Sequence, residues 1–229
     1  MSDAAVVAKG LCRRYGRRWA LSSVDLELGE GRRFLVVGAN GSGKTTLLRL
    51  VSTCASPSRG TLRILGLDPA RHLEAIRQQV GFLSHQPALY EDLSASENLQ
   101  VVSRLLGVAD DSENLLHRVH LDNRPDPVRT YSAGMRKRLA FARLLAQKPR
   151  VVLLDEPYGQ LDPEGFELVD GLIRELAADG ATILIASHLV GRAAKHCDTA
   201  LLLHDGVPRW TGPSAAVISA WQILHGRVA

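Results

Sequence analysis

The chain has 229 residues, of which 45% are hydrophobic and only 5% aromatic, and its formal net charge is +4. This length allows one domain with a sizeable core. A core rich in aliphatic and poor in aromatic residues suits a buried α/β sheet better than an all-β sandwich. No apolar run is long enough to span a bilayer, and the first five residues lack the basic region and long apolar stretch of a signal peptide. We therefore expect a cytosolic protein without a segment inserted in the membrane.

Arginine and lysine residues cluster at 13–14, 17–18, 32–33 and 136–138. Basic clusters can bind nucleic acid or anionic lipid. Binding of single-stranded nucleic acid also needs aromatic platforms on which bases stack, and the net charge of the whole chain is mild. We interpret the clusters as solvated surface that partly faces nucleotide phosphates, and we expect no nucleic-acid partner.

Up to residue 84 the pattern predicts mainly strands. Alternating apolar and polar residues indicate half-exposed strands, and a short, entirely apolar run indicates a buried strand. Turn residues separate them at 29–31 and 56–60. In chain order the predicted elements are strands at 6–12, 24–28 and 33–37, a helix beginning at 46, a strand at 61–65, a helix at 70–79 and a strand at 80–84.

The next block, residues 88–148, is predicted to be mainly helical. Residues 94–97 form a capping box that begins one helix, with Gly107 near its end. Beyond residue 150 the pattern is β-α-β-α-β, with turn residues Asp205 and Gly206 inside a hairpin. The predicted elements are helices within 94–107 and at 135–147, a strand at 151–154, a helix from 162 to 180, strands at 182–186, 200–204 and 207–211, and a last helix at about 213–225.

A glycine-rich loop joins the buried strand at 33–37 to the helix that follows. It reads Gly38-Ala39-Asn40-Gly41-Ser42-Gly43-Lys44-Thr45-Thr46 and matches the phosphate-loop pattern G-x-x-x-x-G-K-[ST]. Glycines let successive N–H groups turn inward on a phosphate, and the helix N-terminus adds partial positive charge there. Lys44 is expected to reach the β- and γ-phosphates, and the Thr45 hydroxyl to ligate Mg²⁺.

The strand at 151–154 is followed by Asp155, Glu156 and Pro157. A carboxylate at the end of a buried strand beside a phosphate loop is where a Mg²⁺ ligand is needed, so Asp155 is the expected metal ligand. Glu156 is placed to polarise or deprotonate an attacking water. The alternative, an acidic turn without function, does not explain why both carboxylates accompany a phosphate loop.

Residues Tyr131-Ser132-Ala133-Gly134-Met135 precede the helix at 135–147 and lie about twenty residues before Asp155. With this spacing the chain resembles the ATP-binding subunits of ABC transporters, and these five residues look like their signature, L-S-G-G-Q. Ser132 and Gly134, which contact phosphate in that family, are kept. Tyr131, Ala133 and Met135 depart from the pattern, and Met135 lacks an amide that could bond to ribose.

Further positions match the family in order. Gln86 looks like the glutamine that ligates Mg²⁺ and senses the transmembrane partner. Asp162 looks like the D-loop aspartate, although Gln160 replaces a small residue. His188 looks like the switch histidine at the γ-phosphate. Tyr15 lies where the family stacks an aromatic ring on adenine, with a plain packing role as the alternative.

The resemblance spans about residues 5–212 and implies the fold and partners of the family. We expect an α/β P-loop NTPase core of the RecA type with a mainly parallel sheet, an N-terminal antiparallel β subdomain and a helical subdomain inserted at about 88–148, all within one ATPase domain at 1–229. The implied ligands are ATP and Mg²⁺. The implied partners are transmembrane permease subunits and a second copy or paralogue, because the signature of one subunit closes on the ATP of another.

The resemblance also suggests a transport class. The segment at 81–99, with its His-Gln-Pro, Leu-Tyr, Leu-Ser-Ala and Glu-Asn-Leu, looks like haem exporter ATPases of cytochrome c maturation. The stretch at 134–139 equally suits subunits of drug, lipid or polysaccharide exporters. A soluble ABC ATPase acting on nucleic acid or ribosomes is the remaining alternative, against which stand the single ATPase domain and the absence of a long coiled coil. We expect the protein at the inner face of the cell membrane.

Overall fold

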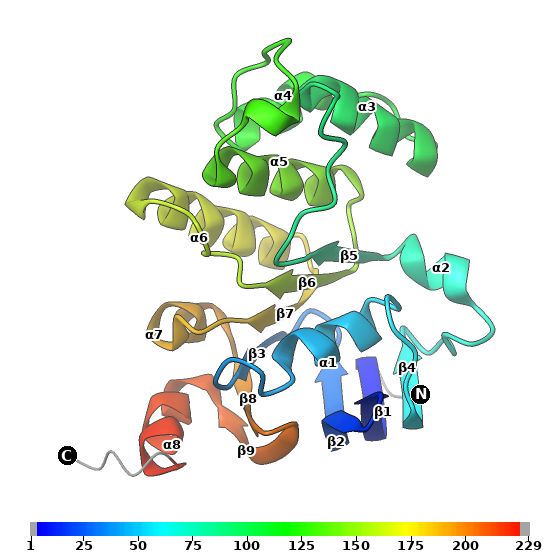
Figure 1. Ribbon diagram of the computed structural model, residues 1–229, viewed down its shortest axis with the longest axis vertical. Coiled ribbons are helices and arrows are strands. Elements are labelled where there is room, and N and C mark those ends of the chain that lie inside the picture. The colour runs from blue at the N-terminus through cyan, green and yellow to red at the C-terminus, as the bar shows by residue number, and fades with distance from the viewer. Residues whose placement is uncertain (1–3, 225–229) are drawn as a thin grey trace.

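The computed structural model describes residues 4–224, in which the strands form two sheets. The larger sheet has the order β5-β6-β7-β3-β8-β9, and its strands run parallel except for β9, which pairs antiparallel with β8. Figure 1 shows it through the middle of the molecule. Its strands are β3 (Arg33–Val37), β5 (Val80–Leu83), β6 (Val151–Asp155), β7 (Thr182–Ala186), β8 (Thr199–His204) and β9 (Val207–Pro213).

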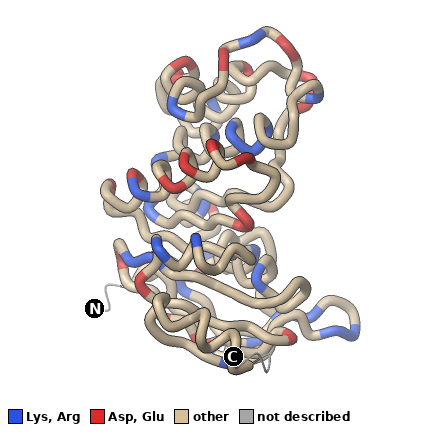
Figure 2. The backbone as a smooth tube through the Cα atoms, turned by 90° about the vertical axis from the view of Figure 1, so that its left-hand side faces the viewer, with Lys and Arg blue, Asp and Glu red and all other residues tan. Residues whose placement is uncertain are grey.

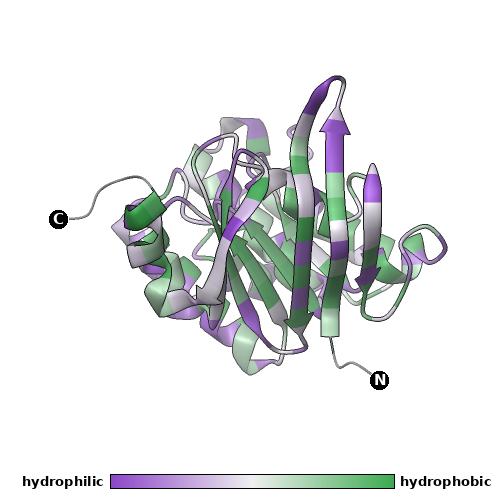
Figure 3. Cartoon of the chain, turned by 90° about the horizontal axis from the view of Figure 1, so that it is seen from below, coloured by the Kyte–Doolittle hydropathy of each residue, from purple (hydrophilic) through white to green (hydrophobic). Residues whose placement is uncertain are grey.

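The central strands of this sheet are buried on both faces. All residues of β6 and β7 are buried, as are the last four of β3. Because side chains alternate across a strand, Leu35 and Val37 pack into one core and Phe34 and Val36 into the other. Near-continuous apolar runs of this kind are typical of parallel sheets covered on both sides, and Figure 3 shows the central strands hydrophobic along most of their length.

The smaller sheet is antiparallel, with the order β2-β1-β4. Its strands are β1 (Ala4–Tyr15), β2 (Arg18–Gly29) and β4 (Arg59–Ile64). Polar and apolar residues alternate along β2 from Val24 to Leu28, and Val24, Leu26 and Leu28 are buried. The apolar face of this sheet shares one core with α1 and the larger sheet.

Helices α3 to α8 cover the other face and the upper end of the molecule in Figure 1, whereas α1 and α2 pack in the core that the antiparallel sheet shares. Helices α3, α4 and α5 lie together there, away from the antiparallel sheet, and α6 lies between them and the rest of that face. Basic and acidic residues are interspersed over this helical part (Figure 2). The helices are α1 (Lys44–Val51), α2 (Leu73–Arg77), α3 (Ala95–Leu106), α4 (Ser112–Arg118), α5 (Ala133–Ala146), α6 (Pro163–Ala178), α7 (Val190–Ala193) and α8 (Val217–Leu224), with 3-10 turns η1 (Val128–Thr130), η2 (Ala194–His196) and η3 (Ser214–Ala216).

The helix-start signals act as the sequence predicts. Ser94 and Glu97 form the reciprocal capping box at the start of α3, and Gly107 ends that helix in the left-handed conformation. The side chain of Asp162 caps α6 by accepting from the N–H of Gly165 at 2.7 Å. Local side-chain to backbone bonds determine these boundaries, so they can be read from a few adjacent residues.

Other boundaries differ from the predictions. Strands β1 and β2 extend beyond the predicted 6–12 and 24–28 because backbone pairing continues through the polar hairpin as far as Tyr15 and Arg18. Helix α2 is shorter than the predicted 70–79 and begins only at Leu73. The last helix begins at Val217 after a 3-10 turn, and the predicted end at residue 225 lies outside the described residues.

Candidate functional site

The loop between β3 and α1 has no room for side chains at two of its glycines. A Cβ at Gly38 would lie 2.2 Å from Ser42 Oγ and 2.5 Å from the carbonyl oxygen of Leu203. Gly43 has φ +104°, and a Cβ there would lie 2.6 Å from the carbonyl oxygen of Ala20. Close neighbours therefore require both glycines, and at Gly43 the positive φ adds to this requirement. The loop keeps the shape of an anion cradle in front of α1.

Lys44 begins α1 and folds back over this loop. Its Nζ donates to the carbonyl oxygens of Gly38 at 2.8 Å and Ala39 at 3.2 Å. Burial lowers the pKa of Lys44, while the nearby Glu156 and Asp155 charges act in the opposite direction. The ammonium group lies at the loop without a direct ion pair to either carboxylate among the described residues, so its charge is available to a phosphate.

Asp155 ends β6 opposite the loop, with 1% of its surface exposed. Its Oδ1 accepts from Thr45 Oγ1 at 3.1 Å. Its Oδ2 is buried and has no hydrogen-bond partner within the described part of the chain. Burial raises the pKa of this carboxyl, whereas the bond from Thr45 acts to lower it. A buried carboxylate oxygen without a partner is costly, and a cation or its water would satisfy it.

These two side chains fit a magnesium site completed by phosphate. Mg²⁺ prefers oxygen ligands and is usually held by one or two protein groups together with substrate phosphates and water. In residues 4–224 no three His, Cys, Asp or Glu side chains gather as a self-sufficient metal site. Thr45 Oγ1 and Asp155 Oδ2 would hold the ion or its waters, and the ion would supply charge neutralisation of the phosphates.

Glu156 and His188 meet beyond the ends of the neighbouring strands β6 and β7. Glu156 Oε2 accepts from the N–H of His188 at 3.1 Å and lies 2.7 Å from His188 Nδ1. The Glu156 side chain is largely buried, whereas 59% of the His188 side chain is exposed. Parallel pairing of β6 with β7 aligns Asp155 with Ala186, which brings together two residues that are distant in sequence.

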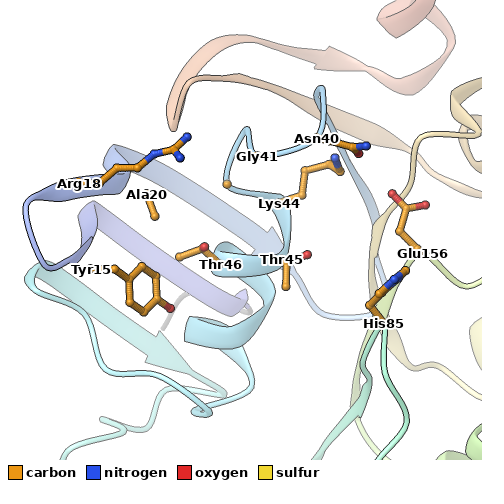
Figure 4. Close-up of a pocket in the computed structure, with 11 residues that line it drawn as sticks. Tyr15, Arg18, Ala20, Asn40, Gly41, Lys44, Thr45, Thr46, His85 and Glu156 are labelled. Carbon is orange, nitrogen blue, oxygen red and sulfur yellow. The ribbon is translucent and has the colours of Figure 1, made fainter.

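The loop opens into a cleft of about 520 Å³. Figure 4 shows Tyr15 and Arg18 on one wall and Glu156 and His85 on the other, with Lys44 between them. Pockets for small ligands commonly measure about 300–1,000 Å³, so the cleft has the size for a nucleotide. The residues that line it are Tyr15, Arg18, Ala20, Asn40, Gly41, Gly43, Lys44, Thr45, Thr46, His85 and Glu156.

Tyr15 is 42% exposed at the end of β1. The guanidinium of Arg13 lies over its ring, 4.6 Å from the ring centroid. Arg13 therefore covers part of the ring, and the ring also borders the cleft. A base in the cleft can reach the remaining surface of the ring. The position agrees with stacking on adenine, which stays a prediction.

Three lining residues have no role in the sequence-based prediction. The side chain of Arg18 reaches over the loop, with a terminal nitrogen 3.9 Å from where a Cβ of Gly41 would stand, and Ala20 lines the cleft beside it. Arg18 belongs to the cluster interpreted as partly facing phosphates, so composition held a weak signal for it. His85 directly precedes Gln86 in the sequence, and no local pattern indicates which of the two lines the cleft.

His85 and Gln86 lie differently around the site. Gln86 lines a second groove, between the sheet and α3 and α5, together with Thr45 and Asp155. His85 lines both this groove and the nucleotide-sized cleft, and its charge acts to lower the pKa of Asp155. The role of Gln86 as metal ligand therefore stays a prediction, with His85 as a second side chain at the same place.

The signature residues lie away from this cleft. Ser132 caps α5, its Oγ accepting from the N–H of Met135 at 3.2 Å. Ser132 and Ala133 are exposed, and Gly134 lies beside the backbone at Gln160, where a Cβ would stand 3.4 Å from the carbonyl oxygen. Asp162, which caps α6, lies two residues after Gln160 in the sequence. None of the five signature residues, 131–135, lines the cleft around Lys44, so any phosphate they bind is a different one.

The basic cluster at 136–138 is not wholly solvated surface, and that interpretation is wrong for its middle residue. Lys137 is 2% exposed, and its Nζ donates to the carbonyl oxygen of Glu156 at 3.2 Å. The helical turn places Lys137 on the buried face of α5, between the helix and the end of β6. Charge patterning along the sequence does not distinguish such a lysine from its exposed neighbours.

Three proteins with similar sequences are named as ATP-binding proteins. The chain is 37% identical over 212 residues to the daunorubicin resistance ATP-binding protein DrrA3 of Streptomyces coeruleorubidus, covering 90% of this chain and 67% of that protein. It is 35% identical to the Nod factor export ATP-binding protein I of Ralstonia nicotianae, covering 86% of this chain and 64% of that protein. It is 31% identical to the lantibiotic transport ATP-binding protein SrtF of Streptococcus pyogenes, covering 86% of each.

Solved structures show the same architecture. The ATP-binding subunit of an ABC transporter superposes with a TM-score of 0.84 at 26% identity, covering 97% of this chain and 94% of the other. The ATP-binding cassette MJ0796, solved as a dimer in a post-hydrolysis state with ADP and Pi, superposes with a TM-score of 0.85 at 25% identity, covering 91% and 98%. Within residues 4–224 no helix is long and apolar enough to cross a membrane.

The α/β fold with a phosphate loop and a mainly parallel sheet is thus the P-loop NTPase fold. A family model described as ABC transporter matches residues 21–159, which is more than half of the chain and contains the loop, Asp155 and Glu156. Proteins of this kind bind ATP with Mg²⁺ and hydrolyse it. The chain belongs to the ABC transporter family as an ATP-binding, ATP-hydrolysing domain.

Proposed function

We propose that this chain is the ATP-hydrolysing subunit of an ABC exporter and acts through separate transmembrane permease subunits at the cytoplasmic face of the membrane. The relatives described above are named for daunorubicin resistance, Nod factor export and lantibiotic transport. These names favour a drug or lipid-like exporter over haem export, since none of the three is named for cytochrome c maturation. The substrate class proposed here is therefore a drug, Nod factor or lantibiotic type of compound.

The observation that carries the proposal is the arrangement of Asp155 and Glu156 opposite the phosphate loop. Lys44 and the loop N–H groups would bind the β- and γ-phosphates, and Thr45 with Asp155 would hold the metal. Glu156 would accept a proton from the attacking water. His188, hydrogen-bonded to Glu156 Oε2, would orient that carboxylate and lie at the γ-phosphate.

The signature requires a second subunit. Ser132 to Met135 form a capped helix start that does not line the chain's own cleft. Such a start favours anions. In the proposed assembly it binds the ATP held by another copy or a paralogue, and the Asp162 segment, which adjoins Gly134, lines the same interface. The γ-phosphate would then join both subunits until it is cleaved.

Purification with the membrane partner tests the transport role. The tagged full-length chain is isolated from detergent-solubilised membranes of its host, and the co-purifying proteins are identified by mass spectrometry. We expect a polytopic membrane protein, and ATP turnover of the isolated complex that rises when the transported compound is added. Recovery of ribosomal proteins or nucleic acid in its place would contradict the exporter role and support the soluble alternative.

The substrate class is tested in everted vesicles that contain the complex. Uptake of daunorubicin, a lipid-linked compound and haem is compared with that in vesicles carrying Lys44→Ala. ATP-dependent uptake of haem alone would contradict the proposed substrate class and support haem export for cytochrome c maturation.

A further inference from the structure

The side chain of Lys137 is buried between α5 and the end of β6. Only 2% of Lys137 is exposed, and its Nζ donates to the carbonyl oxygen of Glu156 at 3.2 Å. Burial lowers the pKa of Lys137, while the charges of Asp155 and Glu156 act to raise it. Burying an ammonium group is costly unless the group is paired and hydrogen-bonded. An apolar residue would fill this place at lower cost, so the lysine calls for a role.

Lys137 holds the backbone of Glu156. Glu156 has φ +49°, a left-handed conformation that residues other than glycine seldom adopt. Its N–H donates to the carbonyl oxygen of Ala186 at 2.8 Å. Its carbonyl oxygen accepts from Lys137 Nζ and from the N–H of Gly159, the latter at 3.1 Å. A strained conformation persists only where its surroundings over-determine it, and here both sides of the residue are held.

This conformation controls where the Glu156 carboxylate points. The side chain turns toward the cleft, where Figure 4 shows it on the wall opposite Tyr15, and Oε2 meets His188. If the carbonyl were released, the residue could relax toward ordinary backbone angles and redirect its carboxylate. Displacements of about 1 Å at a reacting group can cost about a hundredfold in rate.

Lys137 also lies one helical turn from the signature. Ser132 caps α5, the helix begins at Ala133, and Lys137 follows in the same helix. Helices move as rigid units, so a shift of the exposed signature end carries the Lys137 side chain with it. The hydrogen bond from Lys137 to the Glu156 carbonyl oxygen therefore connects the signature end of α5 to the residue whose side chain lines the cleft.

We propose that Lys137 is a positioning residue that holds Glu156 in its catalytic orientation and makes this orientation depend on the position of α5. Docking of the signature on the partner's ATP would align Glu156 in the chain's own cleft. This inference rests on the proposed role of Glu156 as the group that activates water.

The test uses a matched pair of neutral variants in the full-length protein. Lys137→Met removes the donor, and Lys137→Gln keeps an N–H donor on a side chain of similar length to Met. We expect kcat to fall by about 10- to 100-fold in Lys137→Met, with KM for ATP unchanged, and to fall less in Lys137→Gln. Lys195→Met, at an exposed lysine, is the control and should match wild type.

A second readout separates positioning from general destabilisation. In a Glu156→Gln background, Lys137→Met should not lower the residual turnover further, because the carboxylate that it positions is already absent. Nucleotide affinity measured by titration should also stay at the wild-type value. A further loss of turnover, or weakened nucleotide binding, would show a structural role and contradict the proposal.

The outcomes distinguish this inference from the role of Glu156. If Glu156→Gln abolishes turnover while Lys137→Met keeps the wild-type kcat, only the positioning role fails. If Glu156→Gln itself turns over normally, the proposed role of Glu156 fails. Equal losses in the Met and Gln variants would attribute the effect to charge or packing and not to the hydrogen bond. If Lys137→Met does not fold, Lys137→Leu, which also lacks the donor, takes its place, and a wild-type kcat in that variant contradicts the inference.

Discussion

Helix α1 begins after a glycine-rich loop, and α5 begins after a capping serine. Both helix starts have features that bind phosphate, but their surroundings differ. Lys44, at the start of α1, is 7% exposed and lies opposite Asp155 and Glu156 of the same chain. Ser132, at the start of α5, is exposed, and its only described side-chain bond is to Met135. A helix start alone offers N–H groups to an anion. The residues around the helix start determine whether it contacts a phosphate bound by the same chain or one bound by another chain.

The largest effect should come from removing the cation at the α1 start. Lys44→Ala deletes the charge that compensates phosphate, and loss of one such electrostatic group commonly lowers kcat by about 10²–10³-fold. Mg²⁺-dependent ATP turnover and nucleotide binding are measured beside Lys195→Ala, an exposed-lysine control. Unchanged turnover in Lys44→Ala, with contaminating ATPases removed, would overturn the assignment of this loop.

The α5 start should matter only when two subunits meet. Glu156→Gln keeps the size of the side chain but removes the base, so uncleaved ATP should hold two copies together through charge-assisted hydrogen bonds at both helix starts. We expect Glu156→Gln to dimerise with ATP and not with ADP. Adding Ser132→Arg should abolish the dimer by filling the phosphate position, without changing nucleotide affinity of the monomer.

Size-exclusion chromatography with light scattering checks this expectation. Asn123→Arg, at an exposed position between α4 and α5, is a control for a bulky charge elsewhere in the helical part. A Glu156→Gln dimer that is indifferent to Ser132→Arg would place the second phosphate contact somewhere else. If the Glu156→Gln protein stays monomeric with ATP, the same measurement is made on the complex with the membrane partner, because Met135 lacks the signature amide.

A smaller effect separates His85 from Gln86. Both side chains border the groove that contains Thr45 and Asp155, but only His85 also lines the cleft. We expect Gln86→Ala to raise the Mg²⁺ concentration for half-maximal turnover several-fold, and His85→Ala to weaken ATP binding at saturating Mg²⁺. Metal and nucleotide titrations of the two variants decide between them, and the reverse pattern would assign the metal contact to His85.

The smallest effect concerns the base. If Tyr15 stacks on adenine, Tyr15→Ala should weaken ATP binding by about 1 kcal/mol, the scale of one aromatic stacking contact. Tyr15→Phe keeps the ring and should bind almost as wild type does. Calorimetric titration with ATP measures both, and equal affinity in all three proteins would leave Tyr15 with a packing role against Arg13.

Motifs formed by adjacent residues were predictable from the chain alone. The phosphate loop needs glycines at fixed spacing next to a strand and a helix, and the structure has both neighbours in place. The cap residues Ser94, Ser132 and Asp162 each bond to a backbone N–H three residues later, which is a local property. The proposed transport class rests on the names of similar proteins and not on a motif, because a compound that binds to the proposed membrane partner would leave no local signature in an ATPase domain.

What the amino-acid order by itself determined is the set of elements and the chemistry at their ends: a phosphate loop before α1, two carboxylates after β6 and a capped start of α5. Only the tertiary structure decided which ends meet. Parallel pairing of β6 with β7 brings Glu156 to His188, and packing of α5 against the larger sheet brings Lys137 to the Glu156 carbonyl. The physical reason is that bonds within a few residues depend on local backbone geometry, whereas contacts between distant elements depend on how buried faces pack.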